Sequence, residues 1–191
     1  MAPTKHSQPK SLTNSDTNHG HLTIYVGAYS VRGSEGITTY RFDLEKGELA
    51  PIATTPHDQN PSFLAIHPTR PFLFAVSEVA EHQGTAGGAV SSYAIDEETH
   101  ALRLINVQPT MGAAPCHVNV ARSGKWLLTA NYSGGSVTLF PIGEDGSLGK
   151  ASDVQQHAGS GPNPNRQERP HVHSVFPDPE DQWIYVADLG I

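Results

Sequence analysis

Two histidines separated by a single residue, His171 and His173, form the most reactive pair of side chains in the sequence. Side chains two residues apart on a β-strand point to the same side of a sheet, so a strand here would project both imidazoles together. A neutral imidazole accepts a proton near pH 7, and we predict that one of them activates water while the other assists or contacts the substrate. Two alternatives stay open. The pair could share a metal ion, for which the sequence shows no third ligand, or it could line a channel without a chemical role.

Arg166 lies shortly before this pair, in the loop that reads GPNPNRQERP (161–170). A guanidinium stays charged at every working pH and makes two-pronged hydrogen bonds to phosphate or carboxylate. We predict that Arg166 binds an anionic group or steadies a developing oxyanion. The alternative is that Arg166 is a solvated charge on the loop. Glu168 or Arg169 of the same loop could point into the site in its place.

Five further polar residues are candidates for substrate binding, because they lie near the beginnings or ends of strand-like segments. They are Glu78, His117, Asn119, Asn131 and Asp188. The alternative for Glu78, Asn131 and Asp188 is that a polar residue at this place caps a turn in every repeat. Glu78 favours binding, because neighbouring repeats have Tyr or Leu at its place. Cys116 lies beside His117, but a lone cysteine without a positioned acid is usually a small buried apolar residue, and we predict that it is one.

These candidates are carried by segments that repeat along the chain. The copies begin at Pro61, Pro115 and Pro170, which are 54 and 55 residues apart, and they read PSFLAIHPTRPFLFAVSE, PCHVNVARSGKWLLTANY and PHVHSVFPDPEDQWIYVADL. Each copy predicts a short strand, a polar turn and a second strand. When the prolines are aligned, His117 matches Val172 rather than a histidine.

A third strand follows the second in three of the repeats, with the sequences GITTYRF (36–42), AVSSYAI (89–95) and SVTLFPI (136–142). A polar turn and a fourth strand-like stretch come next. Four antiparallel strands in a unit of about 50 residues are typical of a β-propeller blade. The sequence therefore predicts an all-β chain of such blades, and no segment has a convincing helical period.

The predicted units are incomplete at both ends of the chain. They span about 22–55 without a first strand, 60–108, 115–157, and 169–191 with two strands only, after a disordered tail at residues 1–20. This amounts to about three and a quarter blades, whereas a closed ring typically needs four to eight. We expect the chain to be part of a longer protein, and we expect its open edge to self-associate and its own activity to be low.

Strand direction alternates within a blade, so the first strands begin, and the second strands end, at the same end of the ring. Histidine, arginine, glutamate, asparagine and aspartate gather there, whereas the turns PTRP, RSGK and DPEDQ at the other end are chemically ordinary. We place the predicted site at the first of these ends.

The composition excludes several classes of protein. There are 12 Lys and Arg against 19 Asp and Glu, a net charge of −7, and the basic residues are scattered, so neither nucleic acid nor an anionic membrane is an expected partner. The single cysteine cannot form an internal disulfide, and no apolar run reaches the length of a signal-peptide core or a membrane-spanning helix. We expect a cytoplasmic protein.

The repeats resemble the propeller-type 6-phosphogluconolactonase family, which also includes the fungal carboxymuconate cyclases. Six segments in the family's order carry the resemblance over about residues 22–191: YVGAYS (25–30), NPSFLAIHP (60–68), PCHVNV (115–120), NYSGGSV (131–137), RQERPHVHSV (166–175) and VADLG (186–190). The resemblance implies a seven-bladed propeller. The chain departs from the pattern at Ser77-Glu78, where an Asn-Glu pair is more usual, and it lacks the motifs of the later blades.

The resemblance also implies a function, which is the hydrolysis of a sugar lactone, 6-phosphogluconolactone to 6-phosphogluconate in the pentose phosphate pathway, without a metal or other cofactor. His171 or His173 would then be the base, and Arg166 would hold the phosphate or the oxyanion. One alternative is a lactone-forming carboxymuconate cycloisomerase, which would bind carboxylates in the same cationic pocket. The other is a non-catalytic propeller that serves as an interaction platform, and the gathering of His and Arg at one end counts against it.

Overall fold

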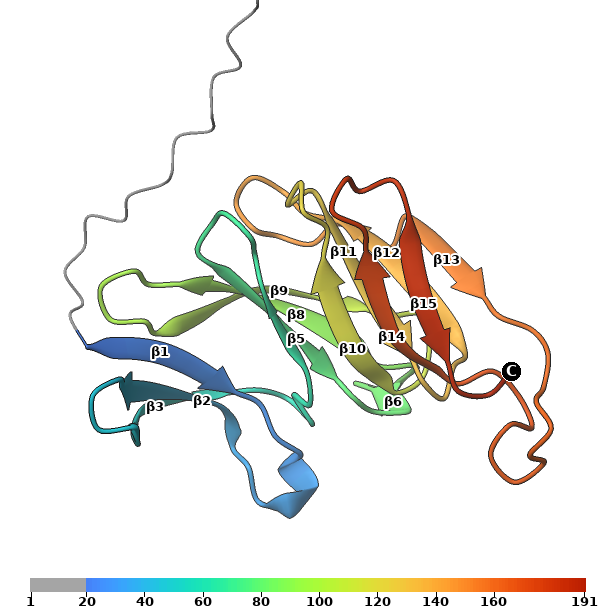
Figure 1. Cartoon of the computed structure of the whole chain (residues 1–191), viewed down its shortest axis with the longest axis horizontal. Helices are drawn as coiled ribbons and strands as arrows, with labels where there is room; N and C mark the ends of the chain where they lie inside the picture. Colours follow the sequence, from blue (N-terminus) through green and yellow to red (C-terminus); the bar gives the residue numbers. More distant parts are fainter. Residues whose placement is uncertain (1–19) are drawn as a thin grey trace, which may run out of the picture.

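Two of the strands are buried on both faces, and this determines how the sheets pack. β5 (Phe72–Ser77) reads FLFAVS and β11 (Trp126–Asn131) reads WLLTAN, and in both strands every residue after the first is buried. A strand that buries both faces needs a neighbouring layer on each side. The structure, a computed structural model that describes residues 20–191, meets this need with a series of sheets that follow one another in chain order (Figure 1).

Each of the four main sheets is antiparallel, and its strands are ordered as they occur in the chain. The first sheet contains β1 (His21–Val26), β2 (Gly36–Asp43) and β3 (Glu48–Pro56). The second contains β4 (Leu64–Ile66), β5, β8 (Ala89–Ile95) and β9 (Leu102–Pro109). The third contains β10 (Pro115–Val120), β11, β12 (Ser136–Pro141) and β13 (Asp153–Gln156), and the fourth contains β14 (Val172–Pro177) and β15 (Ile184–Asp188).

The all-β prediction, with three, four, four and two antiparallel strands in successive units, is confirmed by this arrangement. The structure adds a small hairpin that the sequence analysis missed, formed by β6 (Glu81–His82) and β7 (Thr85–Ala86) between β5 and β8. The single helical segment in residues 20–191 is the short 3-10 turn η1 (Ser30–Arg32). Accordingly, the described residues contain no helix of the length and apolarity that crossing a membrane requires. The predicted tail at 1–20 falls, apart from residue 20, outside the described residues.

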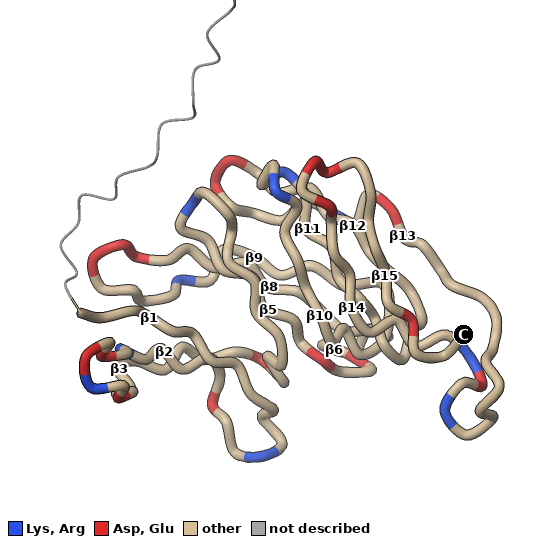
Figure 2. Tube along the Cα trace, in the orientation of Figure 1, with Lys and Arg blue, Asp and Glu red and all other residues tan. Residues whose placement is uncertain are grey.

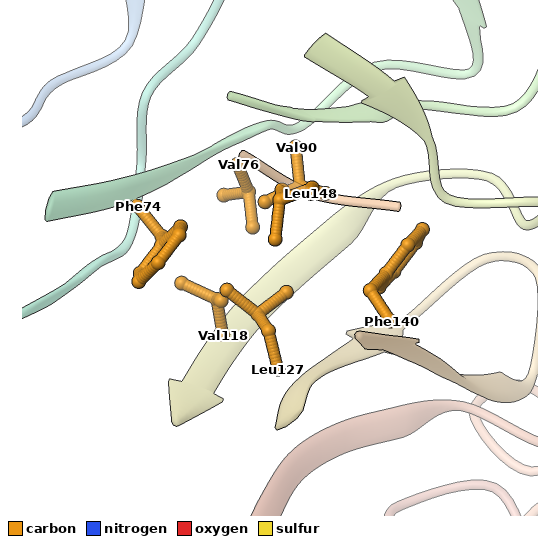
Figure 3. Packing of buried hydrophobic residues seen from close by; sticks show 7 residues of the cluster. All are labelled: Phe74, Val76, Val90, Val118, Leu127, Phe140 and Leu148. Atoms are coloured by element: carbon orange, nitrogen blue, oxygen red, sulfur yellow. The ribbon is translucent and has the colours of Figure 1, made fainter. Parts of the chain in front are cut away.

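Apolar side chains fill the space between each pair of consecutive sheets. The cluster between the first and second sheets contains Ile37, Leu73, Ala75 and Tyr93. The cluster between the second and third contains Phe74, Val76, Val90, Val118, Leu127, Phe140 and Leu148 (Figure 3). The cluster between the third and fourth contains Leu128, Ala130, Val137, Val172 and Val175. Successive residues of β5 and of β11 therefore enter different clusters, as the alternation of side chains along a strand requires.

Most charged residues lie in the turns at the two ends of the sheets, and the middles of the strands contain few (Figure 2). The turns at the upper end in Figure 2 hold several acidic and basic positions, whereas the lower end includes the loop before β14, which carries Arg166, Glu168 and Arg169. The segment after β1, the β6–β7 hairpin and the residues after β15 also lie at this lower end (Figure 1). The chemically richer loops thus share one end of the molecule.

Candidate functional site

A cleft of about 370 Å³ opens at this lower end of the sheets. Its lining residues are Tyr29, Ser62, Glu78, Cys116, Tyr132, Arg166, His173 and Leu189. Three of the predicted site residues, Glu78, Arg166 and His173, are therefore brought together from three different parts of the chain. Four of the lining residues, Tyr29, Ser62, Tyr132 and Leu189, were not singled out in the sequence analysis, and Cys116 was expected to be merely buried.

Equivalent positions of successive sheets supply part of the cleft. Glu78, Tyr132 and Leu189 each come directly after the last residue of the second strand of their repeat, which is β5, β11 or β15. Tyr29 comes later, three residues after β1 ends. Because these strands end at the same end of the molecule, each sheet contributes one side chain to the cleft from just beyond the end of a strand.

A second set of equivalent positions lies at or just before the beginning of the first strand of three sheets, β4, β10 and β14. The members of this set are Ser62, Cys116 and His173. Each lies two residues before a residue that pairs with the second strand of the same sheet, and these pairs are Leu64 with Ala75, Val118 with Thr129 and Val175 with Val186. The strand pairing is shifted at Cys116 in β10 and at His173 in β14, which marks a β-bulge at each. A bulge commonly re-aims a side chain at a site, and here it accompanies the two side chains that line the cleft.

This pairing corrects the predicted alignment of the repeats. Alignment of the initial prolines matched His117 with Val172, whereas the strand pairing matches His117 with Ser174 and Cys116 with His173. The cause is that Pro115 is the first residue of its strand, but Pro170 lies two residues before β14 begins. Trp126 and Trp183, each eight residues after the buried valine of its repeat, give the correct alignment and could have revealed it from the sequence.

The Glu78 carboxylate is held by two hydroxyl groups. Its Oε2 accepts hydrogen bonds from Tyr29 Oη, at 2.9 Å, and from Ser62 Oγ. Burial raises the pKa of the Tyr29 hydroxyl, and the hydrogen bond and the negative charge of Glu78 raise it further, so this hydroxyl remains a donor at neutral pH. Tyr29 and Ser62 thus fix the orientation of the Glu78 carboxylate on the wall of the cleft.

Cys116 lies in the cleft as a protonated thiol. Burial raises its pKa to about 11, and the charge of Glu78 acts in the same direction. The thiol lies 3.3 Å from the carbonyl oxygen of His173, to which it donates. A thiol with so high a pKa is a poor nucleophile near pH 7, so the chemistry of the cleft has to come from other groups.

His171 and His173 do not enter the cleft side by side as predicted. His173 is exposed in the cleft, whereas His171 is buried behind Tyr132, with a ring that stacks on the tyrosine at 4.7 Å between centroids. The His173 ring is nearly perpendicular to the same tyrosine ring, with 6.0 Å between the centroids. The bulge at His173 interrupts the alternation of the strand, which explains why the two imidazoles occupy different environments. His171 Nε2 lies 3.2 Å from Glu168 Oε1.

The Arg166 guanidinium lines the cleft without a side-chain partner among residues 20–191. The loop around it is held by its backbone instead, since the amides of Arg166 and Gln167 both donate to the carbonyl of Asn163. A guanidinium that is not already paired can bind an anionic ligand without breaking an existing ion pair.

Two predicted binding residues, Asn131 and Asp188, have structural contacts outside the cleft. Asn131 is fully buried, and its Nδ2 lies within hydrogen-bond distance of Thr110 O, Ser136 Oγ and Thr138 Oγ1. Asp188 accepts from the backbone amides of His171 and Gly190 and lies 2.7 Å from His157 Nδ1. Despite the opposing effect of burial, these donors lower the pKa of Asp188. Both residues end the second strand of their repeat, so the turn-capping alternative describes their contacts.

The other two, His117 and Asn119, lie on β10 of the third sheet and contact neighbouring sheets. The His117 ring is packed between Phe63, at 4.3 Å, and Phe176, at 5.0 Å, and burial lowers its pKa to about 4. Asn119 Nδ2 donates to the carbonyl of Val175 and thereby links β10 to β14. Neither side chain lines the cleft: both follow the bulge at Cys116, and Asn119 instead lines a hollow at the opposite end of the sheets.

A hollow of about 500 Å³ lies at the other end of the sheets, but its chemistry is poorer. Three prolines line it, and the Asp178 carboxylate there already accepts from the amides of Gln182 and Trp183. The described residues also contain no cluster of three or more His, Cys, Asp or Glu side chains that could hold a metal ion. The cleft with His173, Arg166 and Glu78 is therefore the candidate active site.

Comparison with known proteins shows what the chain is similar to. Residues 23–191 match the family model for the lactonase, 7-bladed beta-propeller. A 6-phosphogluconolactonase of Bacillus subtilis (strain 168) is 38% identical over 167 residues, which are 87% of this chain and 46% of that protein. The chain thus spans about half the length of the curated relatives it matches.

Solved structures lead to the same group. A structure from Bacteroides fragilis NCTC 9343 superposes with a TM-score of 0.84 at 43% identity, covering 93% of this chain and 48% of that one. The periplasmic gluconolactonase PpgL of Pseudomonas aeruginosa superposes with a TM-score of 0.80 at 35% identity, covering 89% of this chain and 47% of that one.

Proposed function

The chain belongs to the seven-bladed β-propeller lactonase family, and from this premise we propose that the whole protein hydrolyses a sugar lactone, with 6-phosphogluconolactone as substrate and 6-phosphogluconate as product. The observation that carries the proposal is the cleft in which an exposed imidazole, His173, lies together with the Arg166 guanidinium, which has no side-chain partner among residues 20–191. Lactone hydrolysis needs a group that takes a proton from water and a positive group for the developing oxyanion or the phosphate.

The proposed reaction uses these residues in sequence. His173 accepts a proton from water as the water oxygen attacks the lactone carbonyl carbon. The carbonyl π-electrons move to its oxygen, and the tetrahedral intermediate then re-forms the carbonyl while the bond to the ring oxygen breaks. The imidazolium returns its proton to that ring oxygen, so the product is an open-chain hydroxy acid that ionises at neutral pH. Arg166 binds the phosphate of the substrate in this proposal.

Neighbouring side chains support the proposed base. The Tyr132 ring packs against the His173 ring in a T-shaped arrangement, and His171 stacks on the same tyrosine with Glu168 at its Nε2. His171 is therefore a positioning residue here rather than the base, because its buried ring is separated from the cleft by Tyr132. A fixed ring keeps its lone pair aimed at the water, which is the geometric requirement for general base catalysis.

The proposal is tested in a closed-ring protein, meaning residues 20–191 joined to the remaining blades of the family. His173→Ala should lower kcat by roughly two to four orders of magnitude with both 6-phosphogluconolactone and gluconolactone. Arg166→Gln should raise KM mainly for the phosphorylated lactone, because only that substrate carries the group it binds. His100→Asn, in the turn between β8 and β9, is the matched control and should leave both rates unchanged.

Unchanged turnover in His173→Ala would remove this residue as the base. Equal effects of Arg166→Gln on the two lactones would remove the phosphate contact. If the protein instead interconverted a carboxymuconate and its lactone while leaving sugar lactones intact, the cycloisomerase alternative would replace the proposal.

A further inference from the structure

Glu78 differs from its counterparts in the other sheets. The position directly after the second strand of a repeat contributes Glu78, Tyr132 and Leu189 to the cleft, and of these three only Glu78 carries a charge. Tyr29, which enters the cleft from three residues beyond β1, is also uncharged. A packing or capping role would be served by similar residue types in each repeat. The single acid at a shared position therefore indicates a role that belongs to the contents of the cleft.

The contacts of Glu78 leave half of its carboxylate available. Oε2 accepts from Tyr29 and Ser62, whereas Oε1 has no hydrogen-bond donor among residues 20–191. A carboxylate accepts hydrogen bonds through both oxygens, so the free oxygen can accept from a ligand. Since Tyr29 and Ser62 come from the first and second sheets, the carboxylate is oriented before any ligand arrives, and binding need not order it.

The acidic side of the cleft is also separate from the basic side. No ion pair joins Glu78 to Arg166 or His173 in the part of the chain that the structure describes, although all three line one cleft. The space between them can hold a molecule with two different ends. A carboxylate repels phosphate and carboxylate groups but accepts hydrogen bonds from neutral hydroxyls.

We propose that Glu78 is a specificity-determining residue whose Oε1 accepts hydrogen bonds from the hydroxyl groups of a polyhydroxylated lactone, while the anionic group of that lactone lies at Arg166. The inference rests on the proposed function and deepens it. It names the substrate class as sugar lactones with vicinal hydroxyls, and it assigns their orientation in the cleft. Tyr29 and Ser62 are positioning residues that hold the carboxylate for this contact.

The test compares Glu78→Gln with Glu81→Gln in the closed-ring protein. Glu81 lies in the neighbouring hairpin outside the cleft lining and is the matched control. The substrates are gluconolactone, which has ring hydroxyls, and δ-valerolactone, which has none. Glu78→Gln should raise KM for gluconolactone by about tenfold or more, because a charge-assisted hydrogen bond is lost, with a much smaller change in kcat. It should leave KM for δ-valerolactone unchanged, and Glu81→Gln should affect neither.

A second measurement separates this inference from the proposed function. Binding of gluconate and of unhydroxylated pentanoate is measured by calorimetry in the wild type, Glu78→Gln and Glu81→Gln. If no lactone is hydrolysed but gluconate binds more weakly to Glu78→Gln than to the other two proteins, the reaction is wrong and the hydroxyl contact stands. If lactones are hydrolysed and Glu78→Gln changes the kinetics of both lactones equally, or lowers kcat for both, the inference is overturned.

Discussion

His57 is a buried titratable residue at a junction between sheets, away from the cleft. It follows β3, and its ring nitrogens lie 2.7 Å from Tyr93 Oη and 3.0 Å from Ser77 Oγ. A neutral imidazole satisfies both hydroxyls with one donor and one acceptor, whereas the protonated form would have two donors. Burial lowers the pKa of His57 to about 4. The nearby Asp58 opposes this shift, and His82 adds slightly to it.

We predict that this histidine makes the protein acid-sensitive. Above pH 6.5 His57 is neutral in both states, so its contribution does not vary with pH. Between about pH 6.5 and 4 the unfolded chain binds a proton that the folded chain resists, and stability therefore falls as the pH falls. The loss amounts to at most about 3 kcal/mol, at about 1.4 kcal/mol per pKa unit. His117, whose pKa burial also lowers to about 4, adds a loss in the same direction.

The measurement is the free energy of unfolding in urea at pH 7, 5 and 4 for the wild type, His57→Gln and the control His100→Asn. His57→Gln should be less stable at pH 7 but should lose less stability on acidification. His100→Asn should keep the wild-type dependence on pH. A His57→Gln curve parallel to that of the wild type would refute the assignment.

For single residues, the sequence predicted which residue types belong to the site better than it predicted where each of them lies. Arg166, His173 and Glu78 were identified because charged or titratable groups near strand ends are good site candidates, and the structure places them in the cleft. His117 and Asn119 were misplaced because a β-bulge changes which side of the sheet every later residue of the strand points to. Nothing in the segment PCHVNV distinguishes a bulged residue from a regular one. The Tyr29 and Ser62 contacts with Glu78 join residues 49 and 16 positions away, which a repeat alignment alone does not reveal.

At the scale of elements, the sequence was more informative. Long repeats with buried strands give a strong periodic signal, and AVSSYAI (89–95) was predicted with the bounds that β8 has. The β6–β7 hairpin was missed because each strand has only two residues and the segment EHQGTA has no apolar alternation. Strands that pack between sheets can thus be predicted from the sequence, whereas short strands held by a few backbone hydrogen bonds cannot.

The packing between sheets predicts a contrast between two leucines. Leu127 of β11 is fully buried between the second and third sheets, whereas Leu49 of β3 is about half exposed. Leu127→Ala should lower the free energy of unfolding by about 2–5 kcal/mol, because it removes buried methyl groups and leaves a cavity. Leu49→Ala removes the same atoms from a solvent-facing strand and should cost less than about 1 kcal/mol. Urea unfolding of both variants checks this, and equal losses would contradict the role given to the sheet interfaces.

For the whole molecule, stability comes from successive interfaces rather than from one central core. Each apolar cluster joins only neighbouring sheets, as in other repeat architectures. The fourth sheet has such an interface on one face, where Val172 and Val175 are buried against the third sheet. On β15, by contrast, Trp183, Ile184 and Tyr185 are exposed by 67%, 49% and 62%, and among residues 20–191 this strand pairs only with β14.

We predict from this surface that the 191-residue chain self-associates through β15. An unpaired strand edge beside exposed aromatic side chains offers both backbone hydrogen bonds and apolar area to a second copy. Light scattering should therefore give a mass above that of a monomer, rising with protein concentration. Tyr185→Lys places a charge on this edge and should shift the mass toward the monomer, whereas Val31→Lys, at an exposed apolar residue of η1, should not. A wild-type mass that stays monomeric at all concentrations would refute association. Equal effects of Tyr185→Lys and Val31→Lys would show that net charge, rather than the β15 edge, controls the association.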